Sequence, residues 1–127
     1  MSILRGLMGA ASEVDMRSLR KEFEPILIDG ESIEKAFQII RELIVFTNKR
    51  LVLVDKQGVT GKKAEYMSIP YRSILRFSKG RRGRMELDSE IKLWVLGMDE
   101  PVVREFKSDE DTNAVYKLLS QFILNVS

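Results

Sequence analysis

The chain contains no cysteine and no histidine among its 127 residues. Without cysteine it can form no disulfide, and it offers neither a thiol nucleophile nor a cysteine ligand for zinc. Without histidine it lacks the commonest general base and the commonest ligand of transition metals. Carboxylate, lysine and tyrosine chemistry remain open, but no pair of such residues has a recognisable catalytic spacing. We therefore expect a binding or assembly module, not an enzyme, with no cofactor and no metal.

Long apolar runs are also missing. No segment approaches the roughly 20 apolar residues that a membrane-spanning helix needs. The apolar start, residues 1–9, is too short and too interrupted for the core of a signal peptide. Serine at the second position excludes N-terminal myristoylation. The expected location is the cytoplasm, with the membrane periphery as the alternative.

Charge is nearly balanced, at 21 basic and 19 acidic side chains, but it is unevenly distributed. Residues 31–98 hold 14 basic and 8 acidic side chains, whereas residues 99–127 hold 3 and 6. A basic middle can attract an anionic partner, yet the net charge of +2 is far from that of a typical nucleic-acid binder. No aromatic residues alternate with the arginines as a stacking platform requires. Nucleic acid is therefore not an expected partner.

The apolar pattern predicts a helix, then strands, then a second helix. A helical period starts near Ser12, which forms a capping box with Asp15, and it ends near Pro25. From residue 31 the period changes to two. The expected strands cover residues 33–39, 43–46, 51–54, 66–71, 73–78, 85–95 and 102–106.

The last element is an amphipathic helix. Ser108 and Asp111 form its capping box, and an apolar stripe follows at helical spacing. The stripe consists of Val115, Leu118, Leu119, Phe122 and Ile123. Seven short strands followed by this helix predict a small antiparallel barrel that the helix plugs.

Four segments together resemble the bacterial pleckstrin-homology-like (PH-like) domain family. They are residues 46–51 (Phe-Thr-Asn-Lys-Arg-Leu), 54–58, 68–74 and 90–94. The resemblance implies a mainly β fold with helices: a PH-like barrel of seven antiparallel strands in two near-orthogonal sheets, capped by a C-terminal helix. It divides the chain into an N-terminal helical extension, residues 1–25, and a PH-like domain, residues 26–127. It also implies a ring-shaped homo-oligomer.

Phosphoinositide binding by the route of eukaryotic PH domains is not expected. That route uses a basic pattern in the first strand and first hairpin, and Lys35 and Arg41 match its first two positions. Leu43 stands where the last arginine is needed, and Glu42 adds a repelling charge.

The candidate site residues fall in two groups. Lys79, Arg81, Arg82 and Arg84 form a basic hairpin that is a candidate anion or interface patch; the alternative is a solvated hairpin tip. The candidate interface residues are Trp94, Leu19 and Phe23. For these, the alternatives are that the first helix covers Trp94 and that this helix buries its apolar face against its own sheet.

Two other motifs do not predict a binding site. Residues 58–63 have too few residues between their glycines for a phosphate-binding loop. Glu86, Asp88 and Glu90 share one strand face, but carboxylates about 7 Å apart do not make a compact cation site.

The sequence is compatible with two functions. The first is a non-enzymatic interaction module that self-associates into a ring-shaped homo-oligomer, with itself or another protein as its partner. The alternative is a peripheral binder of anionic membrane lipid that acts through the basic hairpin.

Overall fold

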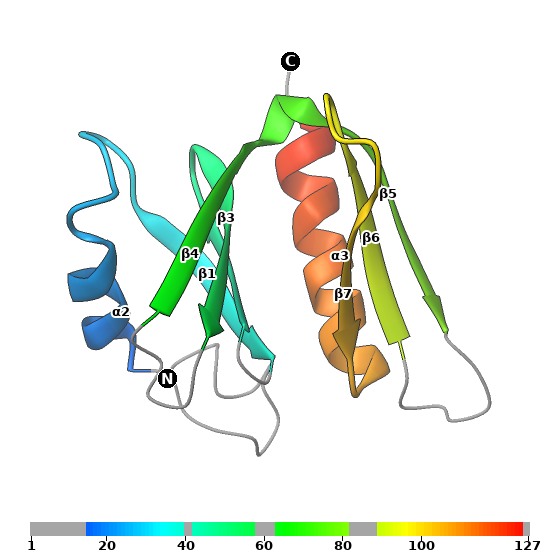
Figure 1. The fold of residues 1–127 in the computed structure, drawn as a ribbon, viewed down its shortest axis with the longest axis horizontal. Helices are drawn as coiled ribbons and strands as arrows, with labels where there is room; N and C mark the ends of the chain where they lie inside the picture. The colour runs from blue at the N-terminus through cyan, green and yellow to red at the C-terminus, as the bar shows by residue number, and fades with distance from the viewer. Residues whose placement is uncertain (1–14, 40–41, 58–62, 82–88, 126–127) are drawn as a thin grey trace. The chain divides into compact units, whose positions relative to one another are not determined.

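The computed structural model describes residues 15–39, 42–57, 63–81 and 89–125 (Figure 1). The helices and strands, in chain order, are α2 (Met16–Phe23), β1 (Ile33–Ile39), β2 (Glu42–Thr47), β3 (Arg50–Gln57), β4 (Lys63–Pro70), the 3-10 helix η1 (Tyr71–Ser73), β5 (Ile74–Arg81), β6 (Ser89–Val95), β7 (Val102–Phe106) and α3 (Asp109–Leu124). All seven expected strands are present, and so is the C-terminal helix. The expected start of the sixth strand, residues 85–88, lies outside the described residues.

Helix α2 begins at Met16, and its N-cap is Asp15. The Asp15 carboxylate accepts a hydrogen bond from the Arg17 backbone N–H at 3.0 Å, which satisfies one of the unpaired donors of the first turn. Ser12, the expected cap, lies outside the described residues. The helix ends at Phe23, as the position of Pro25 predicts.

The chain divides into two compact units, Met1–Ser68 and Ile69–Ser127. In the first unit, β1 to β4 form a four-stranded sheet in chain order, and β1–β2 and β2–β3 pair antiparallel. Helix α2 lies against one face of this sheet (Figure 1). The expected division after residue 25 stays a prediction.

Strands β2 and β3 are buried on both faces. One face carries Leu43, Val45, Val52 and Val54, which pack with α2. The residues between them, such as Ile44 and Leu53, are equally buried. Burial on both faces explains why these strands are continuous apolar runs rather than alternating ones. Ala36 of β1 belongs to the same cluster and is fully buried beneath α2.

The second unit contains a three-stranded antiparallel sheet in the order β5-β6-β7, with α3 packed on it. The Ser108 side chain caps α3 by accepting from the Asp111 backbone N–H at 3.0 Å, as expected. Leu119 is 1 % exposed. Phe122, which also belongs to the apolar stripe, is only half-buried and stacks on Tyr71 with ring centroids 4.8 Å apart.

Two antiparallel sheets of four and three strands, with a C-terminal helix, confirm the mainly β fold class. In the part of the chain that the structure describes, no helix is both long and apolar enough to cross a lipid bilayer.

Candidate functional site

The outer face of the three-stranded sheet is the face turned away from α3. Phe77 of β5 and Ser89 of β6 lie on the α3 side, because each contacts a side chain of α3. Side chains alternate between the two faces along a strand. The β6 side chains on the outer face are therefore Glu90, Lys92 and Trp94.

Trp94 is half-buried, and its neighbour on this face is Arg76. The two residues pair in the β5–β6 register, and the Arg76 guanidinium lies 4.4 Å from the centroid of the Trp94 ring. This is a cation–π contact, which the planar guanidinium favours. Part of the indole remains accessible, as the candidate interface role of Trp94 requires.

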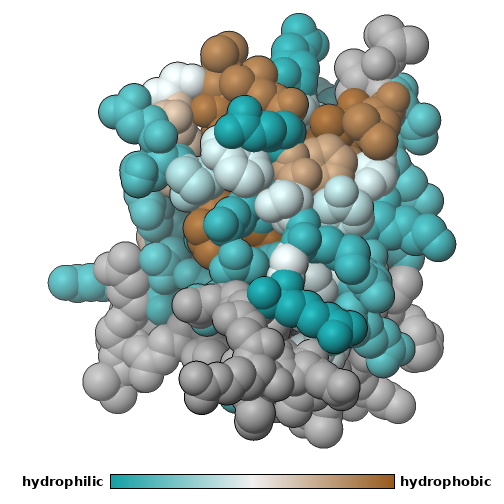
Figure 2. All heavy atoms as spheres, turned by 90° about the vertical axis from the view of Figure 1, so that its right-hand side faces the viewer, coloured by the Kyte–Doolittle hydropathy of each residue, from teal (hydrophilic) through white to brown (hydrophobic). Residues whose placement is uncertain are grey.

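Apolar side chains are exposed around this pair. Leu75 is the extra residue of a β-bulge between Ile74 and Arg76, and it is 62 % exposed. Figure 2 shows brown, apolar side chains gathered toward one end of the face, with polar side chains beside them. We call the following residues the outer patch: Leu75, Arg76, Trp94, Leu96 (68 % exposed), Met98 and Val103. An exposed apolar cluster of this kind is typical of a contact surface.

The basic hairpin is only partly described. Arg82 and Arg84 lie outside the described residues, whereas Lys79 and Arg81 are exposed at the end of β5. The Arg81 guanidinium contacts the Asp109 carboxylate at 2.8 Å. The Ser89 hydroxyl donates to the other Asp109 oxygen, and this hydrogen bond is the main cause that lowers the pKa of Asp109. Arg81 therefore has an acidic partner within its own chain.

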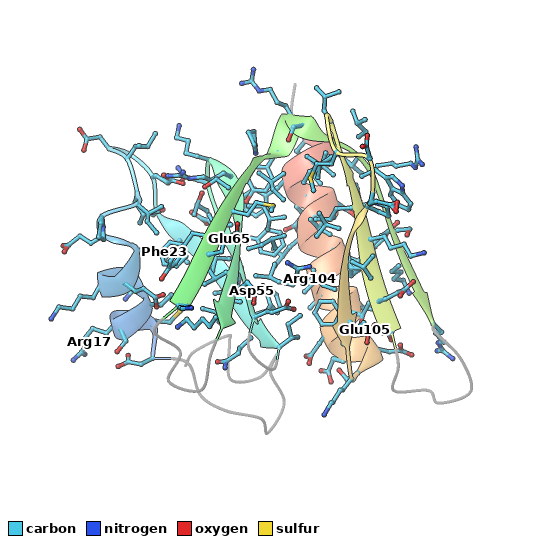
Figure 3. The ribbon with its side chains drawn as sticks, viewed as in Figure 1. Arg17, Phe23, Asp55, Glu65, Arg104 and Glu105 are labelled. Carbon is cyan, nitrogen blue, oxygen red and sulfur yellow. The ribbon has the colours of Figure 1, made fainter. Side chains whose placement is uncertain are left out.

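Leu19 and Phe23, the other candidate interface residues, lie in the core of the first unit. Leu19 is 2 % exposed and Phe23 is fully buried. Figure 3 shows Phe23 on the sheet side of α2, and its ring meets that of Tyr66 edge-on at 5.8 Å. The helix thus buries its apolar face against its own sheet, and these two side chains are not available on the surface.

A buried polar cluster joins the segment after α2 to the β2–β3 turn. We call this cluster the latch: Glu31, Thr47, Asn48 and Arg50. The Glu31 side chain has no exposed surface, and its two oxygens accept from Arg50 Nε at 2.8 Å and Nη2 at 2.7 Å. Thr47 Oγ1 donates to Glu31 Oε2 at 2.6 Å. A bidentate arginine–carboxylate pair is among the strongest hydrogen-bonded arrangements in proteins.

The latch also holds the backbone that follows α2. Arg50 Nη2 donates to the Ile26 carbonyl oxygen at 2.8 Å, and Asn48 Nδ2 donates to the Gly30 carbonyl oxygen at 2.9 Å. Gly30 adopts a positive φ of 81°, which favours glycine at this turn. The sequence predicted only the strands on either side of residues 47–50, and the pairing of Arg50 with Glu31 was missed because the two lie 19 positions apart.

The latch is a structural site rather than a titrating one. The hydrogen bonds from Arg50 are the main cause that lowers the pKa of Glu31 to about 2, against the opposing effect of burial. The same bonds raise the pKa of Arg50. Both groups stay charged at neutral pH, so neither can exchange a proton with a substrate there.

A second polar cluster lies between α2 and the sheet of the first unit. The Tyr66 hydroxyl donates to one oxygen of Glu22, and Lys56 Nζ lies 3.5 Å from the other. Burial is the main cause that raises the pKa of Tyr66 to about 12, and the Glu22 carboxylate adds to it. The raised pKa keeps Tyr66 protonated and therefore a poor general base. Among the described residues, no group of three acidic side chains is placed to hold a metal ion.

Comparison with known proteins agrees with this architecture. The family model of the bacterial PH domain matches residues 2–123. The uncharacterized protein YjqA of Bacillus subtilis is 50 % identical over 121 residues, which is 94 % of this chain and 97 % of YjqA.

Two crystal structures are also similar. A pleckstrin homology domain from Shewanella amazonensis is 47 % identical with a TM-score of 0.78, and the match covers 94 % of this chain and 97 % of that one. A DUF1696 family protein with a pleckstrin-homology domain from Shewanella loihica is 43 % identical with a TM-score of 0.76, covering 88 % and 96 %. With the family model matching nearly the whole chain, the protein belongs to the bacterial PH domain family.

Proposed function

We propose that this protein is a non-enzymatic interaction module that binds copies of itself and closes into a ring-shaped homo-oligomer. The outer patch is the observation that carries the proposal. It combines an aromatic ring, an arginine stacked on it and exposed aliphatic side chains, and interface anchors are enriched in such aromatic and arginine residues.

The two ends of β5 differ in a way that points to the outer patch as the contact. Strand β5 is an edge of its sheet. Its last residues include Lys79 and Arg81, and charges on an edge strand oppose pairing with another strand. Its first residues include the bulge with the exposed Leu75. Contact between copies is therefore best supported at the end of β5 that carries Leu75, through side chains on the outer face of the sheet.

Charge around the outer patch suits a second copy of this chain. Arg72 and Arg76 are exposed on the β5 side, whereas Asp99 and Glu100 are exposed in the turn after β6. A surface that is basic on one side and acidic on the other can meet another copy with opposite charges facing. A contact that joins two different surfaces of successive copies closes into a ring when the rotation allows.

The molecular mass in solution tests the proposal. We expect light scattering after size-exclusion chromatography to give a discrete multiple of 14.6 kDa at micromolar concentration. The double variant Leu75→Lys/Leu96→Lys should reduce the mass to that of one chain, because it places two charges in the apolar contact. Ile28→Lys, at a 61 % exposed position of the first unit, is the matched control and should keep the wild-type mass. A monomeric wild type would overturn the proposal, and an unchanged mass of the double variant would overturn the assigned contact.

The alternative is a lipid contact through the basic hairpin, and the described residues give it less support. The structure describes two cations of the hairpin. Arg81 pairs with Asp109, whereas Lys79 makes no ion pair with a described residue. The two remaining arginines lie outside the described residues. We therefore place the first function ahead of this one.

A further inference from the structure

The turn between β6 and β7 presents exposed side chains from a fixed backbone. The Met98 N–H donates to the Val95 carbonyl oxygen at 3.0 Å, which closes a four-residue turn. Gly97, the third residue of this turn, has a φ of 88°, which favours glycine there. The Leu96 N–H donates to the Ser73 carbonyl oxygen at 2.8 Å. This hydrogen bond ties the turn to the residue before β5 and so holds it near the β-bulge of the outer patch.

Met98 is the methionine of the outer patch, and it is 43 % exposed. The two other methionines that the structure describes, Met16 and Met67, are partly buried in the first unit. The chain has six methionines and no cysteine, so its oxidisable sulfur atoms are all thioethers. Access to the oxidant decides which of them reacts first. Among the described residues, Met98 is therefore the sulfur most open to a peroxide.

We propose that Met98 is an oxidation site at which a hydroperoxide weakens the contact between copies of this chain. This inference rests on the proposed self-association, because it concerns the same outer patch. The Met98 sulfur attacks one oxygen of the peroxide, so that an S–O bond forms and the O–O bond breaks. The sulfur gives up two electrons and becomes a sulfoxide. The departing oxygen takes up the proton of the transferred one, and hydrogen peroxide is thereby reduced to water.

The sulfoxide places a polar group in the apolar part of the outer patch. A thioether is a flexible apolar side chain that suits aliphatic neighbours, whereas a sulfoxide carries a polar oxygen. Contact with a second copy removes water from that oxygen, and the nearby side chains of Leu96 and ionised Asp99 have no hydrogen-bond donor for it. Burying an unpaired polar group weakens a contact roughly 10- to 100-fold. Oxidation should therefore shift the equilibrium towards single chains.

Assembly should in turn protect the same sulfur. A second copy seated on the outer patch covers Met98, so a peroxide reaches this side chain mainly in free chains. The coupling is reciprocal: if oxidation disfavours assembly, assembly disfavours oxidation to the same extent. The change is also reversible, because methionine sulfoxide reductases remove the oxygen as water while two thiols become a disulfide. Those thiols belong to the reductase system, since this chain has no cysteine.

Hydrogen peroxide treatment followed by light scattering tests the proposal. The protein is treated near the concentration at which half of it is assembled, and peptide mass spectrometry then locates each added oxygen. In wild type we expect oxidation at Met98 and a fall of the mass towards the 14.6 kDa of one chain. The apparent dissociation constant should rise roughly 10- to 100-fold per contact. Methionine sulfoxide reductases for both sulfoxide epimers, with dithiothreitol, should restore the mass.

Two replacements of Met98 and one matched control separate this site from general oxidative damage. Met98→Leu keeps an apolar side chain without sulfur, so it should assemble like wild type and keep its mass in peroxide. Met98→Gln supplies a permanent polar group and should weaken assembly without any oxidant. Met67→Leu removes a partly buried methionine of the first unit and should respond to peroxide as wild type does. The melting temperatures of both Met98 variants should stay unchanged, because the side chain is exposed.

Failure of the two proposals can be told apart. An oligomer whose mass is unchanged although Met98 is oxidised would overturn the oxidation site and leave self-association standing. An equal loss of mass in wild type and Met98→Leu would do the same, because the damage would then lie elsewhere. Equal rates of Met98 oxidation in the assembled and the dilute protein would place this side chain outside the contact and overturn the inference. A wild type that is monomeric before peroxide is added would overturn self-association, and the inference with it.

Discussion

Two arginine–carboxylate pairs tie a helix or its flanking segment to a sheet, one pair in each unit. Arg50 and Glu31 join the segment after α2 to the β2–β3 turn, and the Glu31 side chain has no exposed surface. Arg81 and Asp109 join β5 to the start of α3, with side chains 64 % and 36 % exposed. The contact distances, 2.7 Å and 2.8 Å, are nearly the same. Burial, rather than distance, therefore sets how much each pair matters.

The largest expected effect is that of breaking the buried pair. Arg50→Ala leaves the Glu31 carboxylate buried without its main partner and removes the hydrogen bond to the Ile26 carbonyl. We expect the free energy of unfolding to fall by about 3–5 kcal/mol. Urea unfolding followed by circular dichroism measures this loss. A loss below about 1 kcal/mol would show that the buried pair behaves like a surface pair.

In the second unit, α3 should depend on its apolar side more than on its ion pair. Leu119→Ala should lower the free energy of unfolding by about 2–5 kcal/mol, because Leu119 is 1 % exposed and truncation leaves a cavity. Leu124→Ala is the control within the same helix. At 69 % exposure, its change should stay within about 0.5 kcal/mol. An unchanged melting temperature of the Leu119 variant would contradict the packing.

Acid should weaken the first unit through Glu31. Its pKa of about 2 in the folded chain lies below the ordinary value of 4.5, so the folded state binds this proton less readily than the unfolded state. The stabilisation is complete above about pH 4.5 and is lost as the pH falls through about 2. Urea midpoints across this range should fall for wild type and change less for Glu31→Gln. Parallel curves for the two proteins would contradict the assignment.

The smallest expected effect is that of breaking the exposed pair. Arg81→Ala should change the free energy of unfolding by less than about 1 kcal/mol, because both partners are solvated. Added salt should shrink even this difference. Urea unfolding at low and high salt measures it. A loss as large as that of Arg50→Ala would remove the distinction between the two pairs.

Local periodicity predicted much of this fold. The alternation in β5 to β7 and the capping box at Ser108 depend on neighbours in sequence, and both were confirmed. The buried position of Ala36 was not predicted, because nothing near it in sequence shows that α2 covers that side of β1.

The candidate site was less predictable than the fold. The face that Trp94 occupies depends only on the alternation of side chains along β6, which is a local pattern. The outer patch also needs Leu75, which a β-bulge exposes, and bulges have no clear sequence signal here. The latch joins Glu31 to Arg50 across two strands and a turn, so only the tertiary structure reveals it.

The packing of α2 also matters for where the chain can be shortened. A fragment that starts at residue 26 would lack Leu19 and Phe23, which cover Leu43, Val45 and Val52. Its four-stranded sheet would then carry an uncovered apolar face of β-branched residues, the kind of surface from which strands aggregate. The helix is therefore a protective cover of the sheet, and its removal should yield insoluble protein rather than a smaller domain.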